Sequence, residues 1–209
     1  IFDREALLGV SITGWMNNPN ILFDEKILQK GAKIVKDVNK EVAAVIGINP
    51  AARTTCVKPS GNASVLLQTA SGIHAEHSSM YIRNVQMNKE SEITQAIMKT
   101  NPYMVEESVW SAGGTDVVVS FPILPKKGSM YKDDLLGVKH LELVAKAQKY
   151  WVEVGTNEDL CADKGVRHNV SNTIIVDDWN AVENYVFENR HSFAGISFLG
   201  MTGDKDYNQ

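Results

Sequence analysis

The sequence has only two cysteines in 209 residues, Cys56 and Cys161, and neither has a C-x-x-C companion. Such scarcity is typical of a reducing compartment and argues against a disulfide-stapled secreted domain. Long hydrophobic runs are also missing, because no apolar stretch approaches the roughly 20 residues of a membrane-spanning helix. The first residues lack the charged-then-apolar order of a signal peptide, so we expect a cytoplasmic protein without membrane contact.

The sequence also lacks an excess of positive charge. The formal net charge is -4 and the sequence pI is about 5.7, which disfavours direct nucleic-acid binding over a wide surface. With 44% hydrophobic and 22% charged residues, the chain has the composition of an ordinary globular protein. It begins at Ile1 instead of methionine, so a processed product and a part of a longer polypeptide both stay open.

Hydrophobic periodicity predicts alternating helices and strands, and therefore an α/β protein with a largely parallel sheet. The clearest helix spans residues 24–47, with Asp24 as its N-cap and Gly47 as its stop. Its apolar residues recur on one helical face: Ile27, Ile34, Val38, Val42, Val45 and Ile46. Further helices are expected at 63–70, 91–100, 132–155 and 177–190, the second of them opened by Ser91. Strands are expected at 53–57, 81–87, 115–123, 167–176 and 193–200. The continuous apolar run within 115–123 predicts burial on both faces.

The stretch TTCVKPSGNASVLLQTASG joins a strand to a helix through small hydroxyl residues. A helix N-terminus presents unpaired backbone N–H groups that attract phosphate. Gly61 allows a close approach, side-chain donors come from Ser60, Asn62 and Ser64, and Lys58 adds a positive charge nearby. The Walker A order is absent. A turn that carries only a Ser or Asn cap also explains the local pattern. A scaffold turn and a phosphate site therefore both stay open at this point.

Other candidate chemistry is sparse. His74 and His77 have a spacing of three residues, but they lie in a loop pattern without a cluster of carboxylates or cysteines beside them, so no metal site is predicted. Cys56 is expected to be a small buried residue of a strand, whereas Cys161 lies in a polar loop, which leaves an exposed position open. No oxyanion motif accompanies either one. The residues alone therefore predict no catalytic set.

Five ordered motifs carry a family resemblance: LLGVSITGWMNNP, TTCVKPSGNASVLLQTASGIHAEHSSMYIRNVQ, DVVVSFPI, RHNVSNTIIV and ENRHSFAGISFL. Together they resemble the carboxy-terminal part of the catalytic barrel of ribonucleotide reductases, in particular the adenosylcobalamin-dependent (class II) ribonucleoside-triphosphate reductases. The matching positions are Lys58, Pro59, Ser60 and Gly61, then Gly72, Ile73 and His74, then Tyr81, Ile82 and Arg83. Asn62 stands where the family usually has threonine, and it retains hydrogen-bonding capacity.

The resemblance implies that residues 1–209 are an incomplete domain of a ten-stranded α/β barrel. It also implies an oxidoreductase that converts ribonucleotides to the deoxyribonucleotides needed for DNA replication. In that family adenosylcobalamin generates a thiyl radical and a cysteine pair supplies the electrons. The substrate phosphates are held by the loop that corresponds here to Ser60, Gly61, Asn62, Ala63 and Ser64.

The mismatches to the family are equally specific. The N-x-C-x-E finger-loop motif and the reducing cysteines are missing from these 209 residues. The resemblance therefore implies no catalytic residue here and no activity for this piece alone. The expected partners are the amino-terminal part of the reductase, a ribonucleoside di- or triphosphate and a dithiol reductant such as thioredoxin. A noncatalytic nucleotide-phosphate-binding module and a structural half-barrel that needs a partner chain remain alternative hypotheses.

Overall fold

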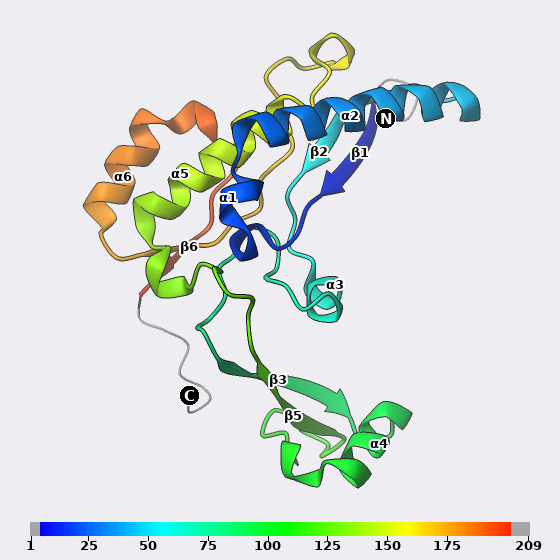
Figure 1. Cartoon of the computed structure of the whole chain (residues 1–209), viewed down its shortest axis with the longest axis vertical. Coiled ribbons are helices and arrows are strands. Elements are labelled where there is room, and N and C mark those ends of the chain that lie inside the picture. Colours follow the sequence, from blue (N-terminus) through cyan, green and yellow to red (C-terminus); the bar gives the residue numbers. More distant parts are fainter. Residues whose placement is uncertain (1–4, 202–209) are drawn as a thin grey trace. The chain divides into compact units, whose positions relative to one another are not determined.

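A computed structural model describes residues 5–201, which form two compact units (Figure 1). The larger unit combines the residues up to Glu76 with those from Lys126 onward, and the smaller unit is His77–Pro125. The strands of the larger unit are β1 (Ala6–Ser11), β2 (Ala51–Cys56), β6 (Ile174–Val176) and β7 (Phe198–Gly200). Its helices are α1 (Pro19–Leu22), α2 (Glu25–Ile46), α3 (Gly61–Leu66), α5 (Gly137–Ala147) and α6 (Trp179–Glu188).

Helix α2 confirms the prediction for residues 24–47. The Asp24 side chain accepts a hydrogen bond from Ile27 N at 2.9 Å, and Gly47 ends the helix with φ 73°. The buried side chains are Leu28, Ala32 and Ala43, on the side that packs on β2 and on the π-helical segment Gln148–Glu153. The six larger apolar residues predicted from the periodicity are exposed instead. The pattern identified a real apolar face, but it is not the face that this unit buries.

The strands of the larger unit pair in parallel, as predicted. Strand β1 runs alongside β2, and β6 runs alongside β7. A parallel bridge between Val57 and Val170 extends the pairing beyond β2. The strands predicted at 167–176 and 193–200 are shorter in the structure, where they form β6 and β7. The Asn172 Nδ2 group donates hydrogen bonds to the carbonyls of Val170 and Gly195, at 2.7 and 3.1 Å, and so keeps the residues before each strand in a loop.

The helix predicted at 132–155 is divided into three pieces. A 3₁₀ turn covers Lys132–Asp134, α5 begins at Gly137, and the π-helical segment Gln148–Glu153 follows directly. The helix predicted at 63–70 is also displaced, since α3 covers only Gly61–Leu66. In contrast, α6 matches its predicted position, and the Asp178 side chain caps it by accepting from the backbone N–H of Asn180 and Ala181.

The core of the larger unit lies where α2, α5 and the π-helical segment meet the parallel strands. Its most deeply buried large side chains are Trp15, Met16, Leu28, Ile73, Leu135, Leu141, Ile174, Val57, Val144 and Val152. Burial of side chains of this size is the dominant stabilising contribution to folding. None of the helices within residues 5–201 is both long enough and apolar enough to cross a membrane.

The smaller unit is a three-stranded antiparallel sheet in the order β3 (Tyr81–Asn88), β5 (Asp116–Ile123), β4 (Val105–Glu107), with helix α4 (Glu92–Thr100). The predicted strands 81–87 and 115–123 and the helix opened by Ser91 are confirmed. Val117, Val118 and Val119 are buried, but the central strand has antiparallel neighbours. The apolar run therefore identified a central strand without identifying its kind of sheet.

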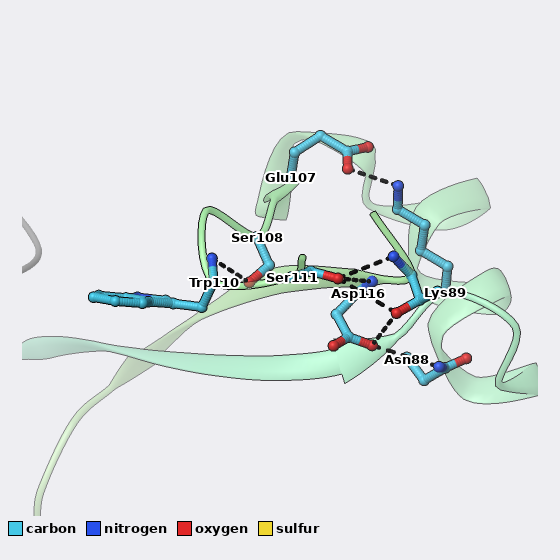
Figure 2. Close-up of polar contacts among 8 residues, drawn as sticks. Asn88, Lys89, Glu107, Ser108, Trp110, Ser111 and Asp116 are labelled. Atoms are coloured by element: carbon cyan, nitrogen blue, oxygen red, sulfur yellow. Dashed lines mark hydrogen bonds and ion pairs between the residues drawn. The ribbon is translucent and has the colours of Figure 1, made fainter. Parts of the chain in front are cut away.

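A hydrogen-bonded turn connects β4 to β5 (Figure 2). Ser111 Oγ accepts from the backbone N–H of Thr115 and Asp116 at 3.0 and 3.2 Å, and Ser108 Oγ accepts from Trp110 N at 3.3 Å. The Trp110 ring points away from these contacts (Figure 2) and is exposed. With these three strands, the described residues hold seven strands and not the ten of a complete barrel.

Gly155 provides a test of the packing behind β2. A Cβ atom at this position would lie 1.9 Å from Thr55 Oγ1 and 2.7 Å from Thr55 Cγ2, and the Thr55 hydroxyl is held at 2.7 Å by Trp151 O. We expect Gly155→Ala to lower the free energy of unfolding by about 3 kcal/mol, the upper range for overpacking a core. Gly200→Ala, with no atom within 4 Å of the added Cβ, should change it little. Chemical denaturation measures both, and equal stability of the two variants would contradict this packing.

Candidate functional site

The candidate site lies where β1 and β2 end. Because these strands are parallel, their carboxyl ends Ser11 and Cys56 lie at the same edge of the sheet, which is where α/β proteins bind ligands. The segment after β1 and the loop after β2 leave this edge together. A hydrogen bond joins the two segments where they begin, since Lys58 N donates to Ser11 Oγ at 2.9 Å.

Hydroxyl groups hold the loop in place. Thr13 Oγ1 lies 2.7 Å from Ser60 Oγ, donates to Ala70 O at 3.0 Å and accepts from Gly72 N at 2.9 Å. The Ser60 N–H donates to Ser71 Oγ at 2.9 Å. Thr13 therefore ties the beginning of α3 to the segment that follows the helix. Hydrogen bonds to side chains of other segments therefore fix the position of the loop backbone.

The structure places all five predicted loop residues at the start of α3. Gly61 is its first residue, with φ 31° and open space within 4 Å of where a Cβ would lie. The N–H groups of Ala63 and Ser64 donate to Ser60 O at 2.8 and 3.3 Å, and the buried Ser64 hydroxyl donates to Gly61 O at 2.8 Å. Asn62 is the second residue of the helix. The Ser64 hydroxyl thus supports the backbone of the turn.

Ser60 bears directly on the scaffold-turn alternative. It occupies the N-cap position of α3, but its side chain makes no capping hydrogen bond and contacts Thr13. A capping serine would satisfy one of the backbone N–H groups of the first turn. The predicted capped turn is therefore wrong in its detail. The N–H groups of Ala63 and Ser64 already donate to Ser60 O, whereas those of Gly61 and Asn62 come before the first bond of the helix, so the start of α3 keeps donor capacity next to the open side of Gly61.

One buried amide holds the surroundings of this loop together. Asn17 Nδ2 donates to Glu76 Oε1 at 2.8 Å and to Ser129 Oγ at 2.9 Å. Asn17 Oδ1 accepts from Thr69 Oγ1 at 2.5 Å and from Ala70 N at 2.6 Å. Four bonds satisfy the whole hydrogen-bonding capacity of a carboxamide. Asn17 therefore fixes the segment after α3 against the rest of the larger unit.

Two histidines support the segment that continues from the loop. His74 Nδ1 lies 3.0 Å from Ser71 O, and the buried His140 Nε2 lies 3.1 Å from Ile73 O. Burial lowers the pKa of His140 from 6.5 to about 4, with the Ile73 carbonyl opposing the shift. His140 is therefore neutral near pH 7 and donates from Nε2. His74 belongs to the larger unit and His77 to the smaller one.

Both cysteines are buried. Cys56 was predicted to be buried and is. The polar sequence around Cys161 left an exposed position open, but this thiol is buried as well. Its thiol lies 3.4 Å from Asn157 O and 3.9 Å from Ala52 O, because the polar loop folds back on the start of β2. Burial raises the pKa of both thiols above the usual value of 9.0. Neither cysteine is therefore poised as a thiolate nucleophile.

Thr13 and Asn17 support the candidate site, but the residue patterns did not identify them. Their signal is a group of polar and small residues shortly after β1, namely Thr13, Gly14, Asn17 and Asn18, with the apolar Trp15 and Met16 between them. Polar residues that follow a parallel strand gather at the edge where ligands bind. Their partners lie 47 to 112 positions away in the sequence, so the pairing itself is visible only in three dimensions.

Comparison with known proteins supplies the context of this loop. No family model matches the chain. A probable adenosylcobalamin-dependent ribonucleoside-triphosphate reductase of Dictyostelium discoideum is 29% identical over 59% of the chain. The corresponding enzyme of Euglena gracilis is 24% identical over 73% of it. A crystal structure of a B12-dependent (class II) ribonucleotide reductase superimposes over 87% of the chain, with a TM-score of 0.67 at 20% identity.

The chain resembles part of a class II ribonucleotide reductase. The structural likeness establishes the mixed α/β fold of a segment of that enzyme. The sequence likeness agrees with the motifs that first indicated it. The chain spans only 16% and 21% of the two curated relatives and 24% of the solved structure.

Asn17 allows a direct test of how the reductase-like loop is supported. We expect Asn17→Ala to lower the free energy of unfolding by about 3 kcal/mol, because it leaves buried polar partners with fewer hydrogen bonds. Limited proteolysis should also become faster within residues 58–76. The control is Asn84→Ala, which removes one exposed hydrogen bond from Ser120 Oγ and should matter little. Thermal unfolding and proteolysis report both; an Asn17→Ala protein as stable as the control would contradict the assigned role.

His140 predicts a pH dependence of stability. The pKa is lower in the folded state than in the unfolded chain, so the unfolded chain binds more protons between about pH 4 and 6.5. The contribution of His140 is complete above about pH 6.5 and is lost as the pH falls towards 4, by up to about 3 kcal/mol. His140→Gln, which keeps a side-chain donor, should flatten this part of the profile of unfolding free energy against pH. An unchanged slope in the variant would show that other groups produce it.

Proposed function

We propose that this chain is part of an adenosylcobalamin-dependent ribonucleotide reductase and that it provides the loop that binds the substrate phosphates. The observation that carries the proposal is the preorganised turn at Ser60–Gly61, placed at the carboxyl ends of two parallel strands. The similarity to two adenosylcobalamin-dependent ribonucleoside-triphosphate reductases supports the enzyme class. Reduction of ribonucleotides to deoxyribonucleotides is the activity that we assign to the complete polypeptide.

The loop suits a phosphate group for three physical reasons. Backbone N–H groups at the start of a helix carry partial positive charge. Gly61 leaves open space beside them, so phosphate oxygens can approach the backbone closely. The exposed Lys58 precedes the turn and adds a positive charge to the same loop. The loop residues in this role are Ser60, Gly61, Asn62, Ala63 and Ser64, with Ser64 acting through the Gly61 carbonyl.

The radical chemistry is assigned to residues outside this chain. Cys56 and Cys161 are buried and have raised pKa values, so neither fits a dithiol that exchanges with a reductant. We therefore infer that the reducing cysteines, the radical cysteine and the contacts with a dithiol reductant such as thioredoxin belong to the amino-terminal part and the remaining segments. The proposed role of the present chain is to bind and orient the nucleotide.

We assign the adenosylcobalamin site to other parts of the complete polypeptide. Two cavities of the larger unit have volumes of about 240 and 470 Å³, the size range of small-molecule pockets, and a corrin with its adenosyl group is much larger. The smaller cavity is lined by Arg167, His191 and Glu153, and the larger one by apolar residues of α6 and β7. We assign no residue of this chain to the cofactor. When bound to the complete enzyme, it would supply the radical.

Gly61→Asp tests the loop. The added carboxylate would occupy the open side of the turn, repel phosphate and remove charge-assisted hydrogen bonds worth about 1.5 to 3 kcal/mol, so nucleotide affinity should fall at least about tenfold. The matched control is Gly114→Asp, which adds the same charge at another glycine with positive φ and open space. Calorimetry with ribonucleoside di- and triphosphates measures binding. Unchanged affinity in Gly61→Asp would refute the loop assignment.

Turnover tests the enzyme class separately. The chain, completed by the amino-terminal part of a reductase, should convert a ribonucleotide to a deoxyribonucleotide in the presence of adenosylcobalamin and a dithiol, and Gly61→Asp should reduce kcat/KM. An assembled complex that binds nucleotide at the loop but forms no product would refute the reductase assignment. That outcome would favour a noncatalytic nucleotide-phosphate-binding module.

A further inference from the structure

Strand β3 lies at one edge of the small sheet, beside β5 (Figure 1). No strand within residues 5–201 pairs with its outer side. Its eight residues contain no proline and no glycine, its pairing with β5 has no bulge, and Arg83 is its one charged side chain. Proteins normally protect a long edge with lysines, prolines or bulges, because an unprotected edge pairs readily with another strand. Strand β3 has almost none of this protection.

Hydrogen-bond geometry identifies the main-chain groups of β3 that face outward. Lys89 N donates to Thr115 O at 2.9 Å, in the same register that pairs β3 with β5. The odd-numbered residues of β3 are therefore the ones that bond β5. Pro122, which has no N–H group, lies opposite the even-numbered Ile82, at a position where no such bond is needed. The even-numbered residues thus direct their N–H and C=O groups away from β5.

Three residues keep both of these outward groups available. The carbonyl of Asn88 accepts from Ser91 N at 3.2 Å and belongs to the turn that follows. Ile82, Asn84 and Gln86 are left, and all three are exposed. They are evenly spaced about Asn84, so the open edge is symmetric about that residue.

We propose that β3 pairs with β3 of a second copy of this chain, antiparallel and about a two-fold axis at Asn84. In this register Asn84 lies opposite its counterpart, and Ile82 lies opposite Gln86 of the second copy. Each of these positions is a hydrogen-bonded pair that exchanges two main-chain bonds. The pairing therefore satisfies all outward groups of the three residues and joins the two small sheets into one.

The side chains on the odd-numbered face suit this register. Tyr81 lies opposite Met87 of the second copy, a favourable sulfur–aromatic combination, and Arg83 lies opposite Val85. The Arg83 guanidinium donates to Tyr81 Oη at 3.0 Å and lies 5.8 Å from the centre of the Tyr81 ring. This contact draws Arg83 towards Tyr81 and away from the axis, in opposite directions in the two copies. The pairing consequently brings no like charges face to face.

The Asn84 side chain has a donor left for its counterpart. Its Oδ1 accepts from Ser120 Oγ at 2.9 Å, and its Nδ2 makes no hydrogen bond to another residue of the range 5–201. A carboxamide oxygen has two lone pairs. Each Asn84 Nδ2 is therefore able to donate to Oδ1 of the other copy while the bond from Ser120 is kept.

These features favour a second copy over an unrelated strand. Any strand satisfies main-chain groups, but a different strand would also need an amide opposite Asn84 and an apolar side chain opposite Tyr81. The second copy supplies both in one register. The small unit also gains most from a longer sheet, because within it only Thr94, Ser108 and the three valines Val117, Val118 and Val119 are buried. The pairing goes beyond the proposed function and does not depend on it.

Charge substitutions at Asn84 test the pairing in the complete polypeptide. Asn84→Lys and Asn84→Asp each place like charges opposite one another across the axis, so either change should raise the dissociation constant of the dimer at least about fivefold. An equimolar mixture of the two variants should form a mixed dimer. Asn84→Ala, which keeps every main-chain group, is the control and should dimerise. Sedimentation velocity measures all four, and a monomeric natural chain or a mixture that does not associate would overturn the proposal.

A disulfide tests the register. In Asn84→Cys the two thiols face each other across a pair whose Cα atoms are about 5.5 Å apart, within the range of a disulfide. In Ile82→Cys, the control, the two positions are four residues apart along the strands, or about 14 Å. The native Cys56 and Cys161 are buried and give a low background. We expect a covalent dimer of Asn84→Cys only. Equal cross-linking of both variants would indicate random collision and overturn the register.

Hydrogen exchange distinguishes a second copy from another occupant. The N–H groups of Ile82, Asn84 and Gln86 should exchange at least tenfold more slowly in the dimer than in the Asn84→Lys variant. Slow exchange in a natural chain that is monomeric would show that another segment of the polypeptide covers β3, and would overturn the proposed partner. None of these measurements uses nucleotide or turnover. A failed dimer assay and a failed reductase assay can therefore be told apart.

Discussion

The four hydrogen bonds of the Asn17 carboxamide are the interaction on which the candidate site depends. A buried amide is stable only if its donors and acceptors are satisfied. Asn17 meets this condition by joining three separate segments, around Thr69–Ala70, Glu76 and Ser129. The segment that follows α3 therefore has a single favourable position. The hydroxyl network of Thr13 then transmits that position to Ser60 and to the start of the helix.

The arrangement explains how a short helix can hold a fixed position. A six-residue helix has little stability of its own, and α3 spans only Gly61–Leu66. Its ends are held by side chains that belong to other elements: Thr13 before it and Asn17 after it. The position of the loop therefore depends on the whole edge of the sheet. A change in the residues after β1 would disturb it as surely as a change within it.

Local signals predicted the elements that depend on local physics. The caps at Asp24 and Ser91 and the stop at Gly47 were correct, because each involves atoms only a few residues apart. The α/β class and the parallel pairing of the larger unit were also correct. The resemblance placed the loop at the right point between a strand and a helix, and the role of that loop stays a prediction.

Other features depended on contacts that no local pattern contains. Periodicity showed where α2 is apolar, but which face is covered depends on β2 and on the residues that surround the unit. The loop of Cys161 is polar in sequence, yet it folds against the start of β2 and buries the thiol. The antiparallel neighbours of β5 were missed for the same reason, since a central strand is apolar in either kind of sheet.

The π-helical segment Gln148–Glu153 gives one continuous helix two different sets of neighbours. Before it, α5 packs on α6 and β6, and within it the chain packs on α2 and β2. A π turn holds one more residue than an α turn, so it rotates the side chains that follow relative to those that precede. Trp151 consequently points at β2, where its indole N–H donates to Cys56 O at 3.0 Å. The π turn therefore allows one helix to contact both the helical layer and the strands that carry the loop.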